Sequence, residues 1–174
     1  GRCFGVEENE RAVLLELPAL REIADRLAAL PRVLVHRDFQ SQNIIIREGA
    51  ACLIDFQGMR PGLAKYDIAS LLYEPYVELT ETERAELLEL YRDLRARAGA
   101  PVRTDDDEVI LLCAIQRLMQ ALGAFGYLGL VQGNKSFLEH IPAALASLRG
   151  VVRQIAGMEH LTQTLDNLGD VAVG

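Results

Sequence analysis

The sequence has 174 residues, which suits one domain with a substantial buried core. Hydrophobic residues make up 50% and charged residues 25%, a composition that excludes a disordered chain and a fibrous repeat. Acidic residues outnumber basic ones by 25 to 18, and the net charge of −7 disfavours a broad surface for nucleic acids or anionic membranes, although a local basic pocket for phosphate is compatible with it. We therefore expect one domain over residues 1–174, with no nucleic acid and no membrane among its partners.

The cysteines indicate the compartment. Cys3, Cys52 and Cys113 are odd in number and widely spaced, which favours free thiols and predicts a cytoplasmic location. Cys52 and Cys113 each lie in an apolar run, so we expect both side chains to be buried. We find no apolar stretch of about 18 residues and no signal-peptide pattern at the start of the sequence.

The first part of the chain predicts a helix followed by three short strands. Apolar residues spaced three and four apart mark one helical face over residues 7–30, with a break or a new helix start at Pro18. Short apolar runs predict a strand at 33–35 and two more at 43–46 and 51–54. The last two strands flank a short turn that contains a glycine, which is typical of a β-hairpin.

The chain after Gly62 predicts helices. Asp67 is a candidate cap for a helix over 68–73, and the T-x-x-E pattern of Thr80 and Glu83 is typical of a capping box. The expected long helices run from Thr80 to about Ala98, from Thr104 to about Phe125, and from Phe137 or Pro142 to Ile155. The tail after Gly157 has a weak pattern. The fold class we predict is therefore α+β, mainly α-helical, with a small β-hairpin.

Polar residues gather around the predicted hairpin. A strand leads into Asp38, Asn43 begins the hairpin, and Asp55 follows its return strand. Because a hairpin brings the start of its first strand beside the end of its second, we expect Asn43 and Asp55 to lie together, with Asp38 on the adjoining loop. Phosphoryl transfer from ATP needs oxygen ligands for Mg²⁺ and a carboxylate near the acceptor hydroxyl. Each of the three residues alone would more often be structural; their combination favours a kinase-type site.

These motifs resemble a known family. The run from His36 to Asn43, followed by Asp55-Phe56-Gln57, is similar to the catalytic and metal loops of the aminoglycoside phosphotransferase and choline kinase superfamily, which has a kinase-like fold. Together with the segments Tyr66–Leu72 and Gln116–Gly123, it looks most similar to bacterial kinases that phosphorylate the anomeric hydroxyl of N-acetylmuramate and N-acetylglucosamine. The resemblance covers roughly residues 32–148.

The resemblance implies a role for each matching residue. Asp38 matches the catalytic carboxylate, and Asn43 and Asp55 match the Mg²⁺ ligands. His36 and Asp67 match residues that support the catalytic loop. Further residues are near enough in the sequence to contact a substrate: Arg37, Gln40, Gln57, Arg60 and Tyr66. The implied activity is transfer of the γ-phosphate of ATP, with Mg²⁺, to a hydroxyl of a small molecule, with an amino sugar as the expected substrate.

Two other functions stay open at this point. A pseudokinase-like lobe would bind a ligand or a partner without catalysis, although the intact Asp38, Asn43 and Asp55 argue against it. A kinase for aminoglycosides or choline would use the same mechanism on another acceptor. The net charge of −7 permits a polycationic substrate without indicating one.

The resemblance also predicts what the chain does not contain. Kinase-like enzymes carry a small N-terminal lobe whose strand lysine contacts the phosphates of ATP. Only 35 residues precede His36 here, they have a helical pattern, and none is a lysine. We therefore expect residues 1–174 to correspond to the C-terminal lobe, with the N-terminal ATP-binding lobe absent. We therefore also expect the missing N-terminal lobe to be a partner of this chain, and residues 1–174 alone to be inactive.

Overall fold

The computed structural model describes residues 18–100 and 106–168, and helices dominate it. The α-helices are α2 (Pro18–Ala28), α3 (Ala64–Leu72), α4 (Glu81–Arg97), α5 (Asp106–Gly126), α6 (Ile141–Val152) and α7 (Glu159–Asn167). The strands are β1 (Val33–Val35), β2 (Ile44–Arg47), β3 (Ala50–Leu53) and β4 (Arg60–Gly62). The prediction of a mainly helical α+β fold is thereby confirmed.

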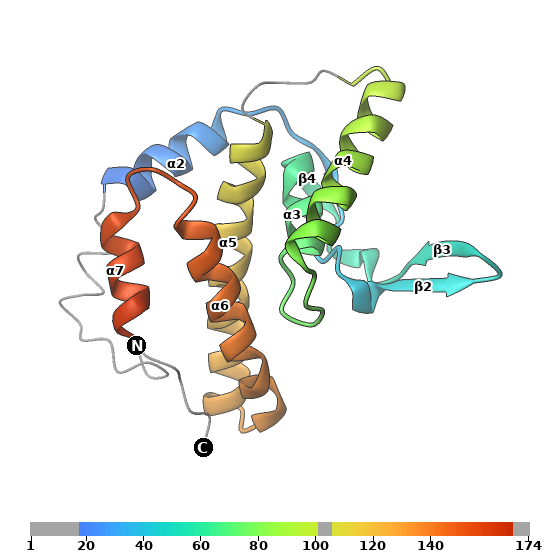
Figure 1. Cartoon of the computed structure of the whole chain (residues 1–174). Helices are drawn as coiled ribbons and strands as arrows, with labels where there is room; N and C mark the ends of the chain where they lie inside the picture. Colours follow the sequence, from blue (N-terminus) through green and yellow to red (C-terminus); the bar gives the residue numbers. More distant parts are fainter. Residues whose placement is uncertain (1–17, 101–105, 169–174) are drawn as a thin grey trace.

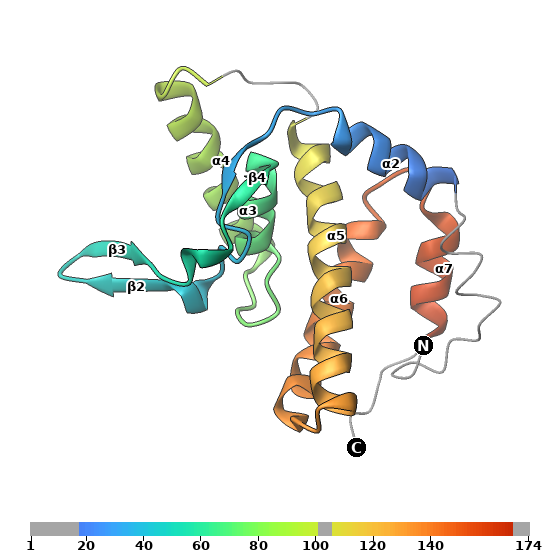
Figure 2. The ribbon, with the colours of Figure 1, turned by 180° about the vertical axis from the view of Figure 1, so that it is seen from behind.

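Helix α5 forms the centre of the molecule. It runs beside α6 and α3, while α2 and α7 lie on the side of α6 away from the strands (Figures 1 and 2). Its apolar residues are buried along almost its whole length; Leu118 and Cys113 are fully enclosed. Burial raises the pKa of the Cys113 thiol to about 12, so this cysteine is an inert part of the core.

The helix continues as a π-helical turn at Tyr127–Val131, and the whole stretch Asp106–Val131 is long and apolar enough to cross a membrane. More than half of its most apolar part is buried inside the protein, as in the core helix of a globular domain. Our expectation that no long apolar stretch exists was therefore wrong, although length and composition alone are weak evidence for a membrane span.

The four strands form two separate antiparallel pairs. Strand β2 pairs with β3 as the predicted hairpin, and Ile44 lies opposite Leu53. The hairpin turn has positive φ at Glu48 (52°) and Gly49 (78°), the geometry whose twist suits a two-residue turn. The hairpin extends away from the helices, and no other element covers it in either view of the ribbon (Figures 1 and 2).

Strand β4 was not predicted. It pairs with β1, so that Val35 lies opposite Arg60. Its sequence is Arg60-Pro61-Gly62, and because proline and glycine both disfavour strands, the sequence pattern did not predict it. A Cβ at Gly62 would lie 2.5 Å from Cγ2 of Val35, so glycine allows the two strands to approach this closely.

Three other expectations need correction. Asp67 does not cap a helix that starts at residue 68, because α3 begins at Ala64 and Asp67 lies in its first turn. Cys52 is exposed on the open hairpin, since no element within residues 18–100 and 106–168 covers that strand. The tail after Gly157 contains α7, which buries Leu161 and Leu165 against the core.

Other helix predictions agree with the structure. The Thr80 and Glu83 capping box is present, and it starts α4 as expected. Helix α2 begins at the predicted start, Pro18, while the predicted helical residues 7–17 lie outside the described part of the chain. The last long helix begins at Ile141, after a 3-10 helix over Lys135–His140.

Candidate active site

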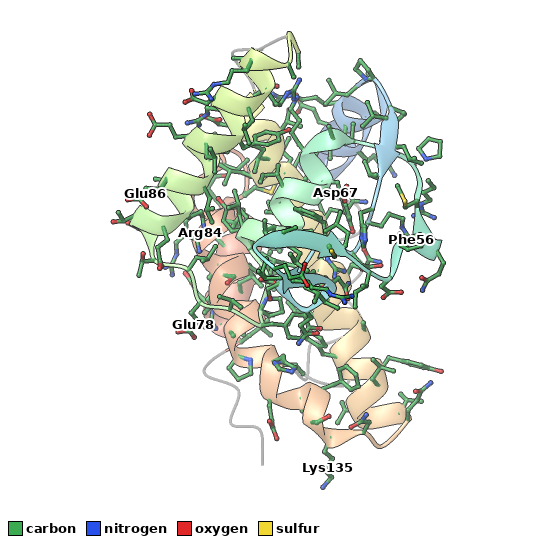
Figure 3. All side chains as sticks on the ribbon, turned by 90° about the vertical axis from the view of Figure 1, so that its right-hand side faces the viewer. Phe56, Asp67, Glu78, Arg84, Glu86 and Lys135 are labelled. Atoms are coloured by element: carbon green, nitrogen blue, oxygen red, sulfur yellow. The ribbon has the colours of Figure 1, made fainter. Side chains whose placement is uncertain are left out.

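Asp67 fixes the backbone of the predicted catalytic loop. Its two carboxylate oxygens accept hydrogen bonds from the backbone N–H groups of His36 (2.7 Å) and Arg37 (2.8 Å), directly after β1. Arg37 has a φ of 77°, a backbone conformation that is costly for a residue with a side chain. Charge-assisted bonds to two successive amides offset that cost and define the path of the loop. Asp67 projects from α3 toward this loop (Figure 3).

His36 joins the loop to the hairpin. Its side chain is buried, and Nε2 lies 3.0 Å from the carbonyl oxygen of Ile54. A carbonyl oxygen can only accept, so Nε2 carries the proton in this contact. The ring also meets Phe39 edge-on. His36 is thus occupied in bracing the loop against β3, the kind of role that the resemblance implied.

Asn43 closes the loop that begins at Asp38. Its side-chain Nδ2 donates to the backbone oxygen of Asp38 at 2.8 Å, and its own backbone oxygen accepts from the N–H of Ile54 at 3.0 Å. Since Ile54 directly precedes Asp55, the three residues of the predicted constellation lie on adjoining segments. The bond to Asp38 uses the amide nitrogen of Asn43, so the amide oxygen is the atom suited to a hard cation.

Glu74 holds the middle of the same loop. Its Oε2 accepts a hydrogen bond from the backbone N–H of Ser41 at 2.9 Å. Burial raises the pKa of the Glu74 carboxyl above its ordinary value, while the hydrogen bonds from Ser41 act in the opposite direction. Glu74 was not among the predicted site residues, since nothing in its sequence surroundings links it to the loop. Together with Asp67, it ties the loop to residues of α3 and its C-terminal end.

Asp55 is the most exposed member of the constellation. It has left-handed backbone angles, φ 63° and ψ 39°, and it precedes a 3-10 turn over Phe56–Gly58. Gln57 Nε2 donates to Asp55 Oδ1. The amide oxygen of Asn43 and the carboxylate of Asp55 are both ligands that Mg²⁺ prefers, so this pair fits a magnesium ion. No three His, Cys, Asp or Glu residues within 18–100 and 106–168 are grouped so that they could hold a metal ion.

The carboxylate of Asp38 pairs with an arginine from the central helix. Arg117 Nη2 lies 3.3 Å from Asp38 Oδ1, and the Asp38 side chain keeps 43% of its surface exposed. Arg117 itself is 12% exposed, and its Nε donates to the hydroxyl of the fully buried Ser70 at 3.1 Å. The carboxylate predicted to be catalytic is therefore paired with a cation that is anchored in the core. Sequence analysis assigned Arg117 no role; an isolated arginine in the apolar stripe of α5 was the signal that could have identified it.

The remaining predicted residues fall into two groups. Arg37, Arg60 and Tyr66 line one cavity of about 150 Å³ between β1, β4, α3 and α5. Gln40 is buried, and its backbone bonds to Asp38 and Asn43 shape the loop. A larger cavity of about 360 Å³ lies between α6 and the segment that joins α3 to α4, and its lining includes Glu74 but none of Asp38, Asn43 and Asp55.

Comparisons with known proteins identify the family. Residues 5–101 match the phosphotransferase enzyme family, APH. That span is more than half of the chain, so the chain belongs to this family, and the resemblance stated from the motifs is confirmed.

The curated relatives are more specific. The chain is 32% identical over 145 residues to an N-acetylmuramate/N-acetylglucosamine kinase of Neisseria meningitidis serogroup B. It is 26% identical over 141 residues to a kinase of the same name from Pseudomonas aeruginosa. The alignments cover 82% and 79% of this chain but 43% and 42% of the two relatives. The chain thus spans less than half of the length of the curated relatives it matches.

Proposed function

We propose that this chain carries the catalytic loop of an ATP- and Mg²⁺-dependent kinase that phosphorylates a hydroxyl of an amino sugar. The observation that carries the proposal is the exposed carboxylate of Asp38, held by Arg117 at 3.3 Å on a loop that also presents Asn43. The names of the curated relatives support an amino sugar as the acceptor.

Asp38 would act on the acceptor, and Arg117 would hold the Asp38 carboxylate in place. The Asp38 carboxylate would orient the sugar hydroxyl and accept its proton as the phosphoryl group is transferred. Arg117 does not need to contact the substrate in this scheme, because its guanidinium fixes the orientation of the carboxylate. His36 is not assigned as the base, because its ring is buried: Nε2 donates to the backbone oxygen of Ile54, and Nδ1 is enclosed away from solvent.

Asn43 and Asp55 would hold the magnesium ion. A bound Mg²⁺ would supply positive charge that screens the phosphates of ATP. The left-handed backbone of Asp55 places its carboxylate outside the hairpin ladder, where the side chain is exposed. The two residues therefore meet the chemical requirement for the metal, while Asp38 is kept for the acceptor.

A substrate panel with matched variants tests the proposal. The complete gene product that contains this sequence is assayed for ADP release with ATP, Mg²⁺ and N-acetylmuramate, N-acetylglucosamine, choline or an aminoglycoside. We expect turnover with the amino sugars, its abolition in Asp55→Ala, and a loss of at least about 100-fold in kcat for Asp38→Asn with a smaller change in KM for ATP.

Asp93→Asn is the control, because Asp93 is exposed on α4 and belongs to no part of the site. Near-normal turnover in both site variants would refute the assigned roles. Turnover with only choline or only an aminoglycoside would show that the acceptor is not an amino sugar. Binding of ligands without any turnover would favour the pseudokinase-like alternative.

We also propose that the nucleotide-binding lobe is contributed by residues outside 1–174. The chain has two lysines, Lys65 and Lys135. Lys65 pairs with Asp106 at 2.6 Å, and Lys135 lies at the far end of the molecule from Asp67 and Phe56 (Figure 3). We expect the purified 174-residue chain to bind ATP weakly and to transfer phosphate negligibly; robust sugar-dependent ADP release by this chain would contradict the proposal.

A further inference from the structure

The cavity beside the catalytic loop is strongly basic. The cavity has a volume of about 150 Å³, and the residues that line it include Arg32, Arg37 and Arg60. No Asp or Glu is among the described residues that line it. The whole chain has a net charge of −7, so three arginines around one small cavity are a marked local reversal of sign.

The guanidinium groups of Arg32 and Arg37 donate to uncharged backbone oxygens. Arg37 Nη1 donates to the backbone oxygen of Gly58 at 3.3 Å, and Arg32 Nη2 donates to the backbone oxygen of Leu27 at 3.2 Å. Carbonyl oxygens accept hydrogen bonds but carry no net charge. Each guanidinium has five N–H donors, so these bonds position the groups without exhausting them. An anion bound in the cavity would balance part of the positive charge of these arginines.

The size of the cavity limits the anion. Sites that enclose a whole small molecule have volumes of about 300–1,000 Å³. A cavity of about 150 Å³ suits a carboxylate on a short carbon arm, and it excludes a complete sugar ring or nucleotide. The cavity is therefore suited to one charged substituent of a larger ligand.

The cavity adjoins the position of the acceptor. Tyr66 lines it, and the Tyr66 hydroxyl donates to Gln120 Oε1 at 2.8 Å. Burial raises the pKa of Tyr66. The charge of Arg117 lowers this pKa and the charge of Asp38 raises it, so the Tyr66 ring lies within electrostatic reach of both residues. Gln116 and Gln120 of α5 also line the cavity, on either side of Arg117 in the sequence.

We propose that this cavity binds the carboxylate of an acidic amino sugar while the sugar hydroxyl faces Asp38. The inference rests on the proposed sugar kinase function and narrows its substrate class. N-acetylmuramate carries a lactyl ether with a carboxylate, and N-acetylglucosamine is the same sugar without it. The three arginines therefore select the acidic sugar, through charge-assisted hydrogen bonds to its lactyl group.

Binding measurements on the 174-residue chain test this inference. Titration calorimetry at neutral pH and low salt compares N-acetylmuramate, N-acetylglucosamine, D-lactate and inorganic phosphate. We expect N-acetylmuramate to bind about 10-fold or more tightly than N-acetylglucosamine, as one added hydrogen-bonded charge pair predicts, and D-lactate to compete with it. In Arg60→Gln the ratio of the two affinities should fall toward one.

Arg47→Gln is the matched control, because Arg47 is exposed in β2 and does not line the cavity; its affinity ratio should equal that of the unchanged protein. Circular dichroism verifies the fold of both variants. Equal affinity for the two sugars would overturn the inference and leave the sugar kinase proposal standing. Competition by phosphate but not by D-lactate would assign the cavity to a phosphate group and also overturn it. If none of the four probes binds, the inference fails, and turnover of the sugar panel by the complete gene product decides the proposed function separately.

Discussion

At the scale of single residues, Arg117 is the most informative contact of the site. If it orients Asp38, then Arg117→Gln should lower kcat about 10- to 100-fold and change KM for ATP little, because a misplaced carboxylate affects the reacting step. Arg117→Lys should recover part of the loss, since it keeps the charge without the planar guanidinium. Steady-state kinetics of the complete gene product with N-acetylmuramate measure both effects.

A comparison arginine separates positioning from stability. Arg92 pairs with Asp107 at 2.5 Å on the surface, away from Asp38, so Arg92→Gln should leave kcat unchanged. Ser70→Ala removes the hydroxyl that holds Arg117 and should reproduce a weaker form of the Arg117→Gln defect. Equal losses in Arg117→Gln and Arg92→Gln, or a change confined to KM for ATP, would contradict the positioning role.

Some site residues could be predicted and others could not, for a physical reason. Asp38, Asn43 and Asp55 lie within 18 residues of one another around a hairpin, so their juxtaposition follows from local geometry. The contact between Asp38 and Arg117 joins α5 to a loop far earlier in the chain, and it depends on how α5 packs against α3. The sequence contains no period or spacing that encodes such a contact.

At the scale of elements, the end of α5 depends on a glycine. Gly129 lies in the π-helical turn Tyr127–Val131, and a Cβ there would collide with Leu138, reaching within 2.5 Å of its Cγ. We expect Gly129→Ala to lower the free energy of unfolding by about 1–3 kcal/mol, the usual cost of overpacking. Urea denaturation followed by circular dichroism measures it.

The same helix provides the control substitution. Gly123 is exposed in α5, and no atom lies within 4 Å of the position that its Cβ would occupy. Gly123→Ala should therefore stabilise the protein by about 0.5–1 kcal/mol, because alanine favours a helix over glycine. A stabilising effect of both substitutions would show that Leu138 moves aside without cost.

Sequence patterns missed two elements, β4 and α7, for different reasons. Strand β4 contains proline and glycine, and it forms only because β1 supplies a partner for it. Helix α7 has a clear pattern, because Met158, Leu161, Leu165 and Leu168 are spaced three and four apart, but it is only nine residues long and sequence analysis passed over it. The hairpin and α4 were predictable because a glycine turn and a capping box are local signals.

At the scale of the whole molecule, the strand region has an unusual surface. Large apolar side chains are exposed there, including Leu34 (66%), Ile46 (69%) and Phe56 (62%). Phe56 lies at the outer edge of the molecule in the side view (Figure 3). An isolated two-stranded hairpin is marginally stable in water, so this region is suited to contact with another part of a protein. It supports our proposal that a further lobe covers it.

Apolar dye binding checks this reading of the surface. The 174-residue chain should bind an apolar fluorescent dye, and Ile46→Lys should reduce that signal about twofold or more, because Ile46 is among the most exposed apolar residues. Leu94→Lys on α4, where the leucine is 54% exposed, is the control and should change it less. If a larger gene product contains a covering lobe, it should bind less dye per molecule than the chain alone; equal dye binding would contradict that lobe.

The two amides held by Asp67 have a consequence for the mobility of the loop. A surface loop ordinarily exchanges its amide hydrogens with solvent through small local openings. The amides of His36 and Arg37 donate to the carboxylate of Asp67 on a helix that packs on α5, so they exchange only when these two charge-assisted bonds break. Deuterium uptake at these two positions should therefore be nearly as slow as in α5, while the β2–β3 turn exchanges quickly. The loop would thus keep its shape before any ligand arrives, and no ordering entropy would be lost on binding at this point of the site.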